Sequence, residues 1–361
     1  MGALRPKRSS PPSLSPWQQQ QQQASFQSMA FAACKTVFLL AVSCVLGFCF
    51  LRVVARSPAV KGTEAINLLV DGVGHVINLE EGPHNEKVYL GAVIFNRVFP
   101  EDLFNITAYE CKQWIEYMLF AGVQHIYWYD TAHSDGESQQ AYLQEYVEKG
   151  LLTYHRFHHL YPGNLDSGYH FEQDHAYEHF LETYGFEVAW VVEMDVDEYP
   201  FMLSDLNKLF LRRYVEYQAK ARPDVSQILM PCMIFGGNPK GDLENGWVIE
   251  RYQRRKRVTE GVRAGFASRT KPIFQPKHAK GVGFLDPHQF PMASGDTLIA
   301  DPEKLRMNHY WGPRLTDFGP DTSAVLSLLV PDDSAQPIAT ELKERTGLAD
   351  KKACLQHRRP S

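Results

Sequence analysis

Runs of strand-forming and helix-forming sequence alternate between residues 88 and 235, and this alternation constrains the fold more than any other feature. Alternating units of this kind connect with a right-handed crossover and build a mostly parallel sheet covered by helices on both faces. Ligands of such sheets bind beyond the carboxyl ends of the strands. We therefore predict an α/β fold. The expected strands are 88–95, 123–129, 151–157, 187–194 and 226–235, and the expected helices are 107–121, 137–149, 171–184 and 204–221.

An uncharged segment at 36–51 precedes this domain, and its apolar extension is long enough to span a bilayer. Four basic residues and no acidic residue precede it, so the positive-inside rule places the N-terminus in the cytosol. We predict a disordered cytosolic tail at 1–33 and a transmembrane signal anchor at 34–55. The expected location is the Golgi or ER membrane, with single-pass type II topology. A cleaved signal peptide and a soluble protein with a buried apolar helix are the alternatives.

The remaining chain divides by composition. Gly-rich and polar sequence at 56–86 predicts a stem or linker. The regular pattern predicts one lumenal domain at 87–325, and residues 326–361 are expected to form a C-terminal tail. A sequon at Asn105 fits a lumenal domain. The net charge of −5 argues against nucleic acid as a partner.

The most informative local pattern is an apolar strand that ends in an acidic cluster. Residues 190–194 are mostly apolar, and Asp195, Asp197 and Glu198 follow. Two carboxylates spaced i and i+2 just past a strand can hold one hard divalent cation, such as Mg²⁺ or Mn²⁺, and leave positions open for substrate phosphates. The alternative interpretation is a solvated acidic turn.

Three further patterns have both functional and ordinary interpretations. His309 could supply a third metal ligand, or it could be a hydrogen-bonded histidine without that role. Basic residues between 251 and 271 could face a diphosphate, or they could form a solvated loop. Six histidines fall between His155 and His179, but their spacing matches no standard zinc site. Cys111, Cys232 and Cys354 permit one disulfide.

Five short motifs occur in an order that resembles glycosyltransferase family 92. They are Trp114-Ile115-Glu116-Tyr117 with the following strand to Asp130, then Asp195-Val196-Asp197-Glu198-Tyr199, Glu250-Arg251-Tyr252, Lys271-Pro272-Ile273-Phe274-Gln275-Pro276 and Asn308-His309-Tyr310. The resemblance covers about residues 88–320. It implies a GT-A-type catalytic domain of a Golgi enzyme, with a Rossmann-like mixed sheet flanked by helices.

The resemblance also implies an activity and a set of site residues. The activity is inverting transfer of a sugar, often galactose, from a nucleotide-diphosphate donor to a glycan acceptor on a glycoprotein or glycolipid. Asp195 and Asp197 would hold Mn²⁺ or Mg²⁺, and His309 would complete the metal shell. The remaining implied contacts are Asn96 and Asp130 near the nucleoside, Lys271 near the phosphates, and Asp317 as a base or acceptor contact. The sequence departs from the family at Phe95-Asn96-Arg97, where Lys-Asn-Glu is usual.

Direct displacement needs a carboxylate that deprotonates the acceptor hydroxyl. The sequence does not determine which residue is this base. The candidates are Asp242, Glu244, Asp286, Asp296 and Asp317. Two other functions compete with the transferase. One is a catalytically silent lumenal carbohydrate-binding or scaffold protein on the same fold. The other is a haloacid-dehalogenase-type phosphatase, which would place its Asp-x-Asp motif on the first strand rather than the fourth.

Overall fold

The structure is a computed structural model of the 361-residue chain. It describes residues 88–98, 106–132, 135, 137–157, 169–237, 246–256, 270–280, 288–312, 327 and 329–348, together with two short strands nearer the N-terminus. Several predictions concern residues outside this part of the chain. They are the tail at 1–33, the anchor at 34–55, the sequon at Asn105, the thiol of Cys354 and the base candidates Asp242, Glu244, Asp286 and Asp317. Among the helices that the structure does describe, none combines the length and apolar character needed to cross a bilayer.

The chain divides into two compact units, Met1–Glu80 and Glu81–Ser361. The described part of the first unit is a pair of antiparallel strands, β1 (Leu68–Val70) and β2 (Val76–Asn78), within the expected stem. The second unit holds the large sheet and its helices, and everything that follows concerns this unit.

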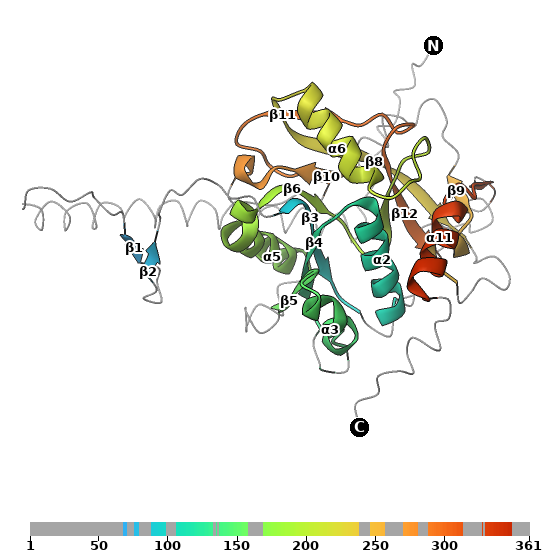
Figure 1. Cartoon of the computed structure of the whole chain (residues 1–361), viewed down its shortest axis with the longest axis horizontal. Helices are drawn as coiled ribbons and strands as arrows, with labels where there is room; N and C mark the ends of the chain where they lie inside the picture. The colour runs from blue at the N-terminus through green and yellow to red at the C-terminus, as the bar shows by residue number, and fades with distance from the viewer. Residues whose placement is uncertain are drawn as a thin grey trace, which may run out of the picture. The chain divides into compact units, whose positions relative to one another are not determined.

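Four parallel strands form one half of the large sheet (Figure 1). They are β3 (Val88–Asn96), β4 (His125–Asp130), β5 (Leu152–Arg156) and β6 (Val188–Glu193), and they lie in the order β6-β3-β4-β5. All three pairings are parallel, and Asn96 lies directly opposite Asp130. The prediction of a parallel sheet is confirmed for this half, and the carboxyl ends of these strands share one edge.

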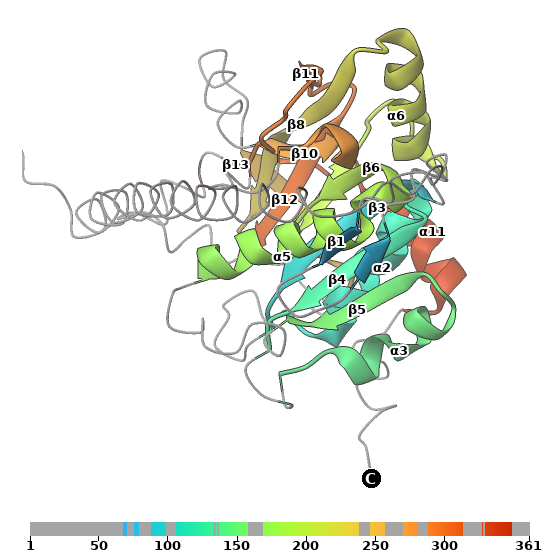
Figure 2. The same ribbon diagram turned by 90° about the vertical axis from the view of Figure 1, so that its left-hand side faces the viewer.

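The other half of the sheet is largely antiparallel, so the sheet is mixed, as the family resemblance implied, although the local strand and helix patterns did not indicate it. Strand β10 (Thr270–Phe274) lies between β6 and the long strand β8 (Val225–Gly236) and runs antiparallel to both. β12 (Arg306–Gly312) joins the second half of β8 to the short strand β7 (Glu198–Phe201). Figure 2 shows β8, β10, β11 and β12 together beyond β6. The remaining strands are β9 (Arg254–Lys256), β11 (Asp296–Ile299) and β13 (Leu329–Pro331).

Helix boundaries follow local signals where these are strong. The predicted capping box at Thr107 and Glu110 starts α2 (Ala108–Ala121), and Gly122 ends it with a φ of 111°. The predicted start at Ser204 is wrong, because α6 (Phe210–Ala221) begins after Leu209, which has a φ of 67°. The other helical elements are α3 (Gln140–Glu148), α5 (Tyr169–Tyr184), α7 (Val248–Arg251), α11 (Gln336–Thr346) and the 3₁₀ turns η2 (Gly185–Glu187) and η5 (Pro276–His278).

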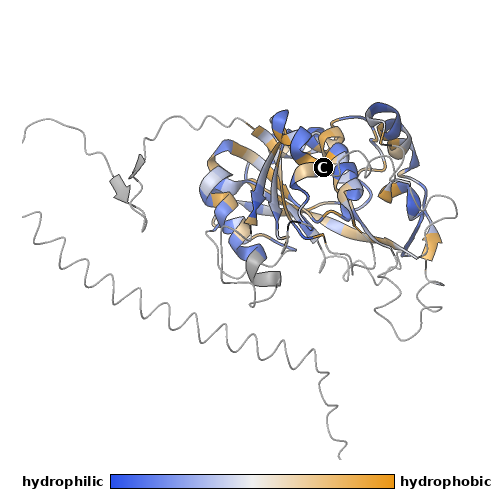
Figure 3. Ribbon diagram, turned by 90° about the horizontal axis from the view of Figure 1, so that it is seen from below, coloured by the Kyte–Doolittle hydropathy of each residue, from blue (hydrophilic) through white to orange (hydrophobic). Residues whose placement is uncertain are grey.

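Side chains of β3 point alternately to two apolar layers, as the pleat of a strand requires. Leu90, Ala92 and Ile94 belong to the larger cluster, which includes buried residues of α2 and α6. Val93 and Phe95 belong to the smaller cluster, which α5 covers. Hydrophilic residues occupy much of the outer helical surface (Figure 3). Helices therefore shield both faces of the sheet and leave its carboxyl edge for ligands.

The folded domain extends past the predicted boundary at residue 325, so the expectation of a tail from residue 326 is wrong for its first part. β13 pairs with β9, and Ile338, Ala339 and Leu342 of α11 are buried in the larger apolar cluster. The indole Nε1 of Trp247 donates to the carbonyl oxygen of Leu348 at 2.7 Å. These contacts join residues far apart in sequence, which is why the local pattern did not reveal them.

Candidate functional site

The acidic turn between β6 and β7 lies at the carboxyl edge of the parallel strands, as predicted. A hydrogen bond of 3.0 Å from the amide of Glu198 to the carbonyl oxygen of Asp195 closes the turn. Asp195 keeps 36% of its side chain exposed, whereas Asp197 keeps 6% and Glu198 keeps 2%. The turn therefore presents one accessible carboxylate and two that the protein holds rigidly.

Helix α2 holds the first residues of β7, which directly follow the acidic turn, through two hydrogen bonds. The indole of Trp114 donates to the carbonyl oxygen of Glu198 at 2.9 Å, and the hydroxyl of Tyr117 donates to that of Pro200 at 2.6 Å. Both aromatic side chains are buried. The Trp114–Tyr117 motif is thus a support for the acidic turn, a role that its helical spacing alone could not reveal.

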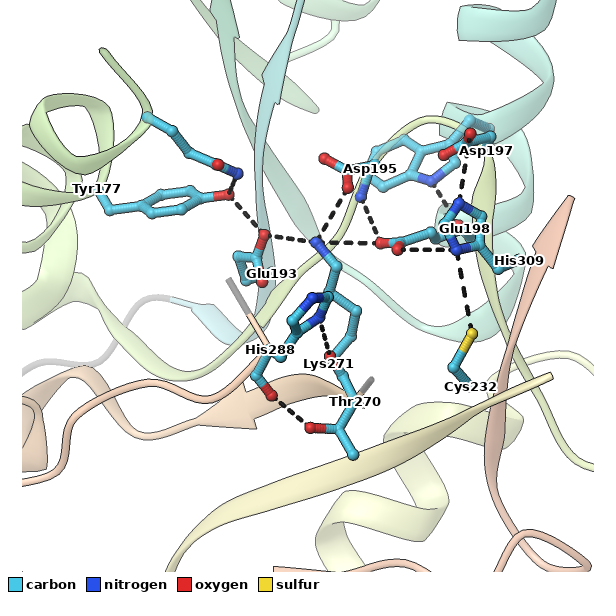
Figure 4. A network of polar contacts seen from close by, with 12 residues as sticks. Tyr177, Glu193, Asp195, Asp197, Glu198, Cys232, Thr270, Lys271, His288 and His309 are labelled. Carbon is cyan, nitrogen blue, oxygen red and sulfur yellow. Dashed lines mark hydrogen bonds and ion pairs between the residues drawn. The ribbon is translucent and has the colours of Figure 1, made fainter. Parts of the chain in front are cut away.

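Lys271 lies at the centre of the site because β10 runs antiparallel to β6. Its Nζ atom is 2.9 Å from Glu193 Oε1, 3.1 Å from Asp195 Oδ2 and 3.2 Å from Glu198 Oε2 (Figure 4). Burial lowers the pKa of Lys271, but the nearby carboxylates of Asp195, Glu193 and Glu198 outweigh it and raise that pKa well above its usual value. The lysine is therefore charged and held in place by carboxylates.

His309 reaches the same turn from β12, which pairs with β7 so that His309 faces Glu198. Its Nε2 atom is 3.5 Å from Asp197 Oδ2, and its Nδ1 atom is 3.6 Å from Glu198 Oε1 and 4.0 Å from Cys232 Sγ. Burial lowers the pKa of His309, but Asp197, Cys232 and Glu198 together raise it well above its usual value. His309 and Asp197, 112 residues apart in the chain, therefore meet at this turn.

Two carboxylates of the site were not among the predicted site residues. Glu193 ends β6, where it accepts a hydrogen bond of 2.6 Å from Tyr177 and contacts Lys271. Burial raises the pKa of Glu193 despite Lys271, and burial likewise raises the pKa of Glu198 to about 7. A charged residue inside an otherwise apolar buried strand was the available signal for Glu193.

Asn96 and Asp130 also lie at the carboxyl edge, at the ends of β3 and β4. Asp130 is buried, and its carboxylate accepts hydrogen bonds from the amides of Ala132 and Gln139 and from the hydroxyls of Ser138 and Tyr154. Its contacts thus organise the loop after β4. Asn96 is buried beside Cys111, with Nδ2 3.8 Å from Sγ.

Asp296, one of the candidate bases, is not near the acidic turn. It starts β11 opposite Val225, whereas Cys232 on the same strand β8 contacts His309. Seven residues of β8 separate these positions, which is about 23 Å at the usual rise of a strand. We therefore exclude Asp296 as the base that serves this site. The other four candidates lie outside the described residues.

The two cysteines that the structure describes, Cys111 and Cys232, are buried free thiols, so no disulfide joins them. The histidine-rich region also has an ordinary explanation. His179 Nδ1 is 2.8 Å from the hydroxyl of Tyr129, and His155 Nε2 is 3.0 Å from that of Tyr184. These two ring nitrogens contact tyrosine hydroxyls.

We define the acidic cluster as Glu193, Asp195, Asp197, Glu198, Lys271 and His309. Its four carboxylates outnumber the ammonium and the imidazole, so its donor set suits a hard divalent cation. Within the described part of the chain, no three His, Cys, Asp or Glu side chains are already gathered as a metal site. However, the 3.5 Å between Asp197 Oδ2 and His309 Nε2 matches two ligands that share one cation at about 2.1 Å each.

The mixed α/β sheet, its flanking helices and the acidic turn at the carboxyl edge fit the GT-A class of glycosyltransferases. The chain belongs to glycosyltransferase family 92, whose family model matches residues 105–346. The matched region includes α2, the acidic turn, His309 and α11. No curated protein matches the chain. The protein is therefore a glycosyltransferase, a class that binds a sugar donor and an acceptor, and the phosphatase alternative loses its basis.

Proposed function

We propose that the protein is a metal-dependent hexosyltransferase, which transfers a sugar such as galactose from a nucleotide-diphosphate donor to a glycan hydroxyl with inversion. The observation that carries this proposal is the acidic cluster at the carboxyl edge of the sheet. Asp195, Asp197 and His309 would hold Mn²⁺ or Mg²⁺. The cation, when bound, would supply positive charge that stabilises the departing diphosphate.

The residues of the chain have distinct tasks in this proposal. Asp195 is the accessible carboxylate of the turn, so it is the one best placed to meet a donor-bound cation. Lys271 keeps Asp195 and Glu198 at fixed positions and adds positive charge beside the leaving group. Asn96 and Asp130 shape the edge where the nucleoside would lie. Asp317 stays our proposed base or acceptor contact.

The sequence supports a proposed location as well. Residues 34–55 would anchor the chain in the Golgi or ER membrane, with the catalytic domain in the lumen. The uncharged segment at 36–51 and the basic residues before it support this topology. A lumenal location would give the enzyme access to glycoproteins and glycolipids.

Within this glycosyltransferase family, one observation favours a second candidate, a member that has kept the fold and binds carbohydrate without catalysis. Lys271 already neutralises part of the charge of Asp195, Glu193 and Glu198, so the turn has an internal cation before any metal binds. A protein that binds carbohydrate without catalysis would need no further charge there.

Donor turnover by the purified full-length chain separates the two candidates. A panel of nucleotide sugars is offered with glycan acceptors in Mn²⁺, in Mg²⁺ and in EDTA, and NMR of the product gives its anomeric configuration. We expect one donor to be used, with loss of turnover in EDTA and in Asp197→Asn. Asp205→Asn is the matched control, because Asp205 lies in the loop before α6 and pairs with Arg213 of that helix rather than with the acidic cluster. Binding of glycan without turnover of any donor would contradict the transferase proposal.

A further inference from the structure

Glu198 contacts both segments that would carry the metal ligands, the acidic turn and strand β12. Its Oε2 atom accepts a hydrogen bond of 2.9 Å from the backbone amide of Asp195 and lies 3.2 Å from Lys271 Nζ. Its Oε1 atom lies 3.6 Å from Nδ1 of His309. Figure 4 shows the carboxylate between the lysine and the imidazole. One side chain thus joins the turn that carries Asp195 to the strand that carries His309.

We propose that Glu198 is a positioning residue, which orients the imidazole of His309 so that Nε2 faces the metal and which holds the backbone of Asp195 in the matching place. This inference rests on the proposed metal-dependent function. It assigns to Glu198 the role that a carboxylate plays when it accepts the second ring N–H of a metal-bound histidine.

The geometry separates Glu198 from the metal ligands themselves. Its carboxylate faces Nδ1, whereas Asp197 faces Nε2 on the other side of the ring. Its second oxygen is engaged by Asp195 and Lys271. Its side chain is 2% exposed, and Trp114 holds its backbone carbonyl. Glu198 is therefore fixed in place and directed away from the position where Asp197 and His309 approach each other.

Both oxygens of Glu198 must be acceptors for this role, because each faces a donor. An amide at this position offers one oxygen and one NH₂ group. If its oxygen serves Asp195 and Lys271, its NH₂ group faces Nδ1, which loses the carboxylate and keeps the weaker sulfur acceptor of Cys232 at 4.0 Å. If its oxygen serves His309, its NH₂ group faces the amide N–H of Asp195 and the ammonium of Lys271, which are donors and need an acceptor. Glu198→Gln therefore cannot satisfy both sides at once.

Glu193 provides a matched control within the same network. It too is a buried carboxylate in contact with Lys271, at 2.9 Å. Its other contact is the hydroxyl of Tyr177, and it has no contact with the imidazole or with the amide of Asp195. Glu193→Gln likewise replaces a buried carboxyl group beside Lys271 with a neutral amide, so it separates a loss of positioning from the loss of a carboxyl group.

The test measures Mn²⁺ itself with the purified full-length chain. Free Mn²⁺ is counted by electron paramagnetic resonance, and electron spin echo modulation reports the nitrogen of a coordinated imidazole. We expect the wild type to bind Mn²⁺ with a nitrogen signal. Glu198→Gln should weaken Mn²⁺ binding about 10- to 100-fold and reduce or abolish the nitrogen signal. Glu193→Gln should weaken binding by less than about threefold and keep the signal. If Glu198→Gln does not fold, Glu198→Asp serves in its place, because it keeps the charge but is too short to reach both partners.

The outcomes separate this inference from the proposed function. Equal weakening in Glu198→Gln and Glu193→Gln would show that the loss of a carboxyl group alone matters, and unchanged binding and signal in Glu198→Gln would show no positioning role. Either result overturns the inference and leaves the metal-dependent transferase standing. Mn²⁺ binding without a nitrogen signal in the wild type would also overturn it, because His309 would not be a ligand. Failure of the wild type to bind Mn²⁺ would overturn both.

Discussion

Helix α2 lies beside two groups of buried charged side chains, which are balanced differently. At its first turn, Glu110 pairs with Arg251 at 2.8 Å, and nearby Lys343 pairs with Glu250 at 2.6 Å. We name these two pairs the paired cluster. At the acidic cluster, four carboxylates share one ammonium and one imidazole. The paired cluster is complete without a ligand, whereas the acidic cluster has a surplus of negative charge.

The difference indicates what each group does. Burying a charge costs several kcal/mol unless a partner offsets it, so a matched pair serves mainly to join elements. The paired cluster joins α2, α7 and α11 into one body. A surplus of like charge opposes folding, and it persists where function needs it. In our proposal the acidic cluster is the functional site, and the two clusters should respond oppositely to substitution.

The largest expected effect is on activity at the acidic cluster. Asp197→Asn should lower kcat/KM for the donor about 1,000-fold, because it removes a proposed ligand of a cation that contributes several kcal/mol to the transition state. The free energy of unfolding should change by less than about 1 kcal/mol, because one of four like charges is removed. Steady-state kinetics and urea unfolding measure the two quantities. A loss of stability as large as the loss of activity would mean that the acidic cluster is structural.

The paired cluster should show the reverse pattern. Arg251→Met leaves Glu110, which is fully buried, without this partner, and the free energy of unfolding should fall by about 3–5 kcal/mol. The folded fraction should keep kcat within about threefold. Adding Glu110→Gln should restore at least half of the stability, because no charge is then left unpaired. If the double variant is no more stable than Arg251→Met, the pairing is not what stabilises this region.

A smaller effect on the free energy of unfolding is expected at the pair of Lys343 and Glu250, and this effect should depend on pH. Burial raises the pKa of Glu250, but hydrogen bonds from Lys343 and Gln336 outweigh it, so that pKa is lowered. A lowered pKa in the folded state stabilises the protein above the unfolded pKa of about 4.3, and this stabilisation is lost as the pH falls through the folded value. Lys343→Met should therefore cost about 1–2 kcal/mol at pH 7 and less at pH 3. Urea unfolding at both pH values checks this, and an equal cost at the two would contradict it.

Local sequence patterns predicted the features whose residues lie close together in the sequence. The capping box of α2 and the apolar strand before Asp195 each lie within a few residues, and both were found. In the antiparallel half, β8 was expected at 226–235, but β10 was missed, because it is five residues long and contains Pro272, which cannot donate to a neighbouring strand. Only the pairing of β10 with β8 and β6, across about 40 and 80 residues, makes it a strand.

The same distinction explains the site residues. Asp195, Asp197 and His309 were predicted, and the structure brings them to one place. Lys271 was expected beside phosphates, and the structure places its ammonium among the carboxylates of the acidic turn, which local patterns did not predict. The positions of Glu193 and Glu198 relative to Lys271 depend on the register of β10, which the sequence pattern does not contain. The sequence signal for these residues was the presence of charged side chains, such as Glu193 and Lys271, in otherwise apolar segments.

The central claim is that the surplus charge of the acidic cluster is a binding site for a divalent cation. Crystals of the full-length chain grown with Mn²⁺ and a nucleoside diphosphate, with anomalous data collected at the manganese edge, test it most directly. We predict one anomalous peak within coordination distance of Asp197 and His309. The carboxylate of Asp195 should have moved away from Lys271 and toward this peak. Diffraction that shows no peak there, with Lys271 still holding Asp195, would contradict the account.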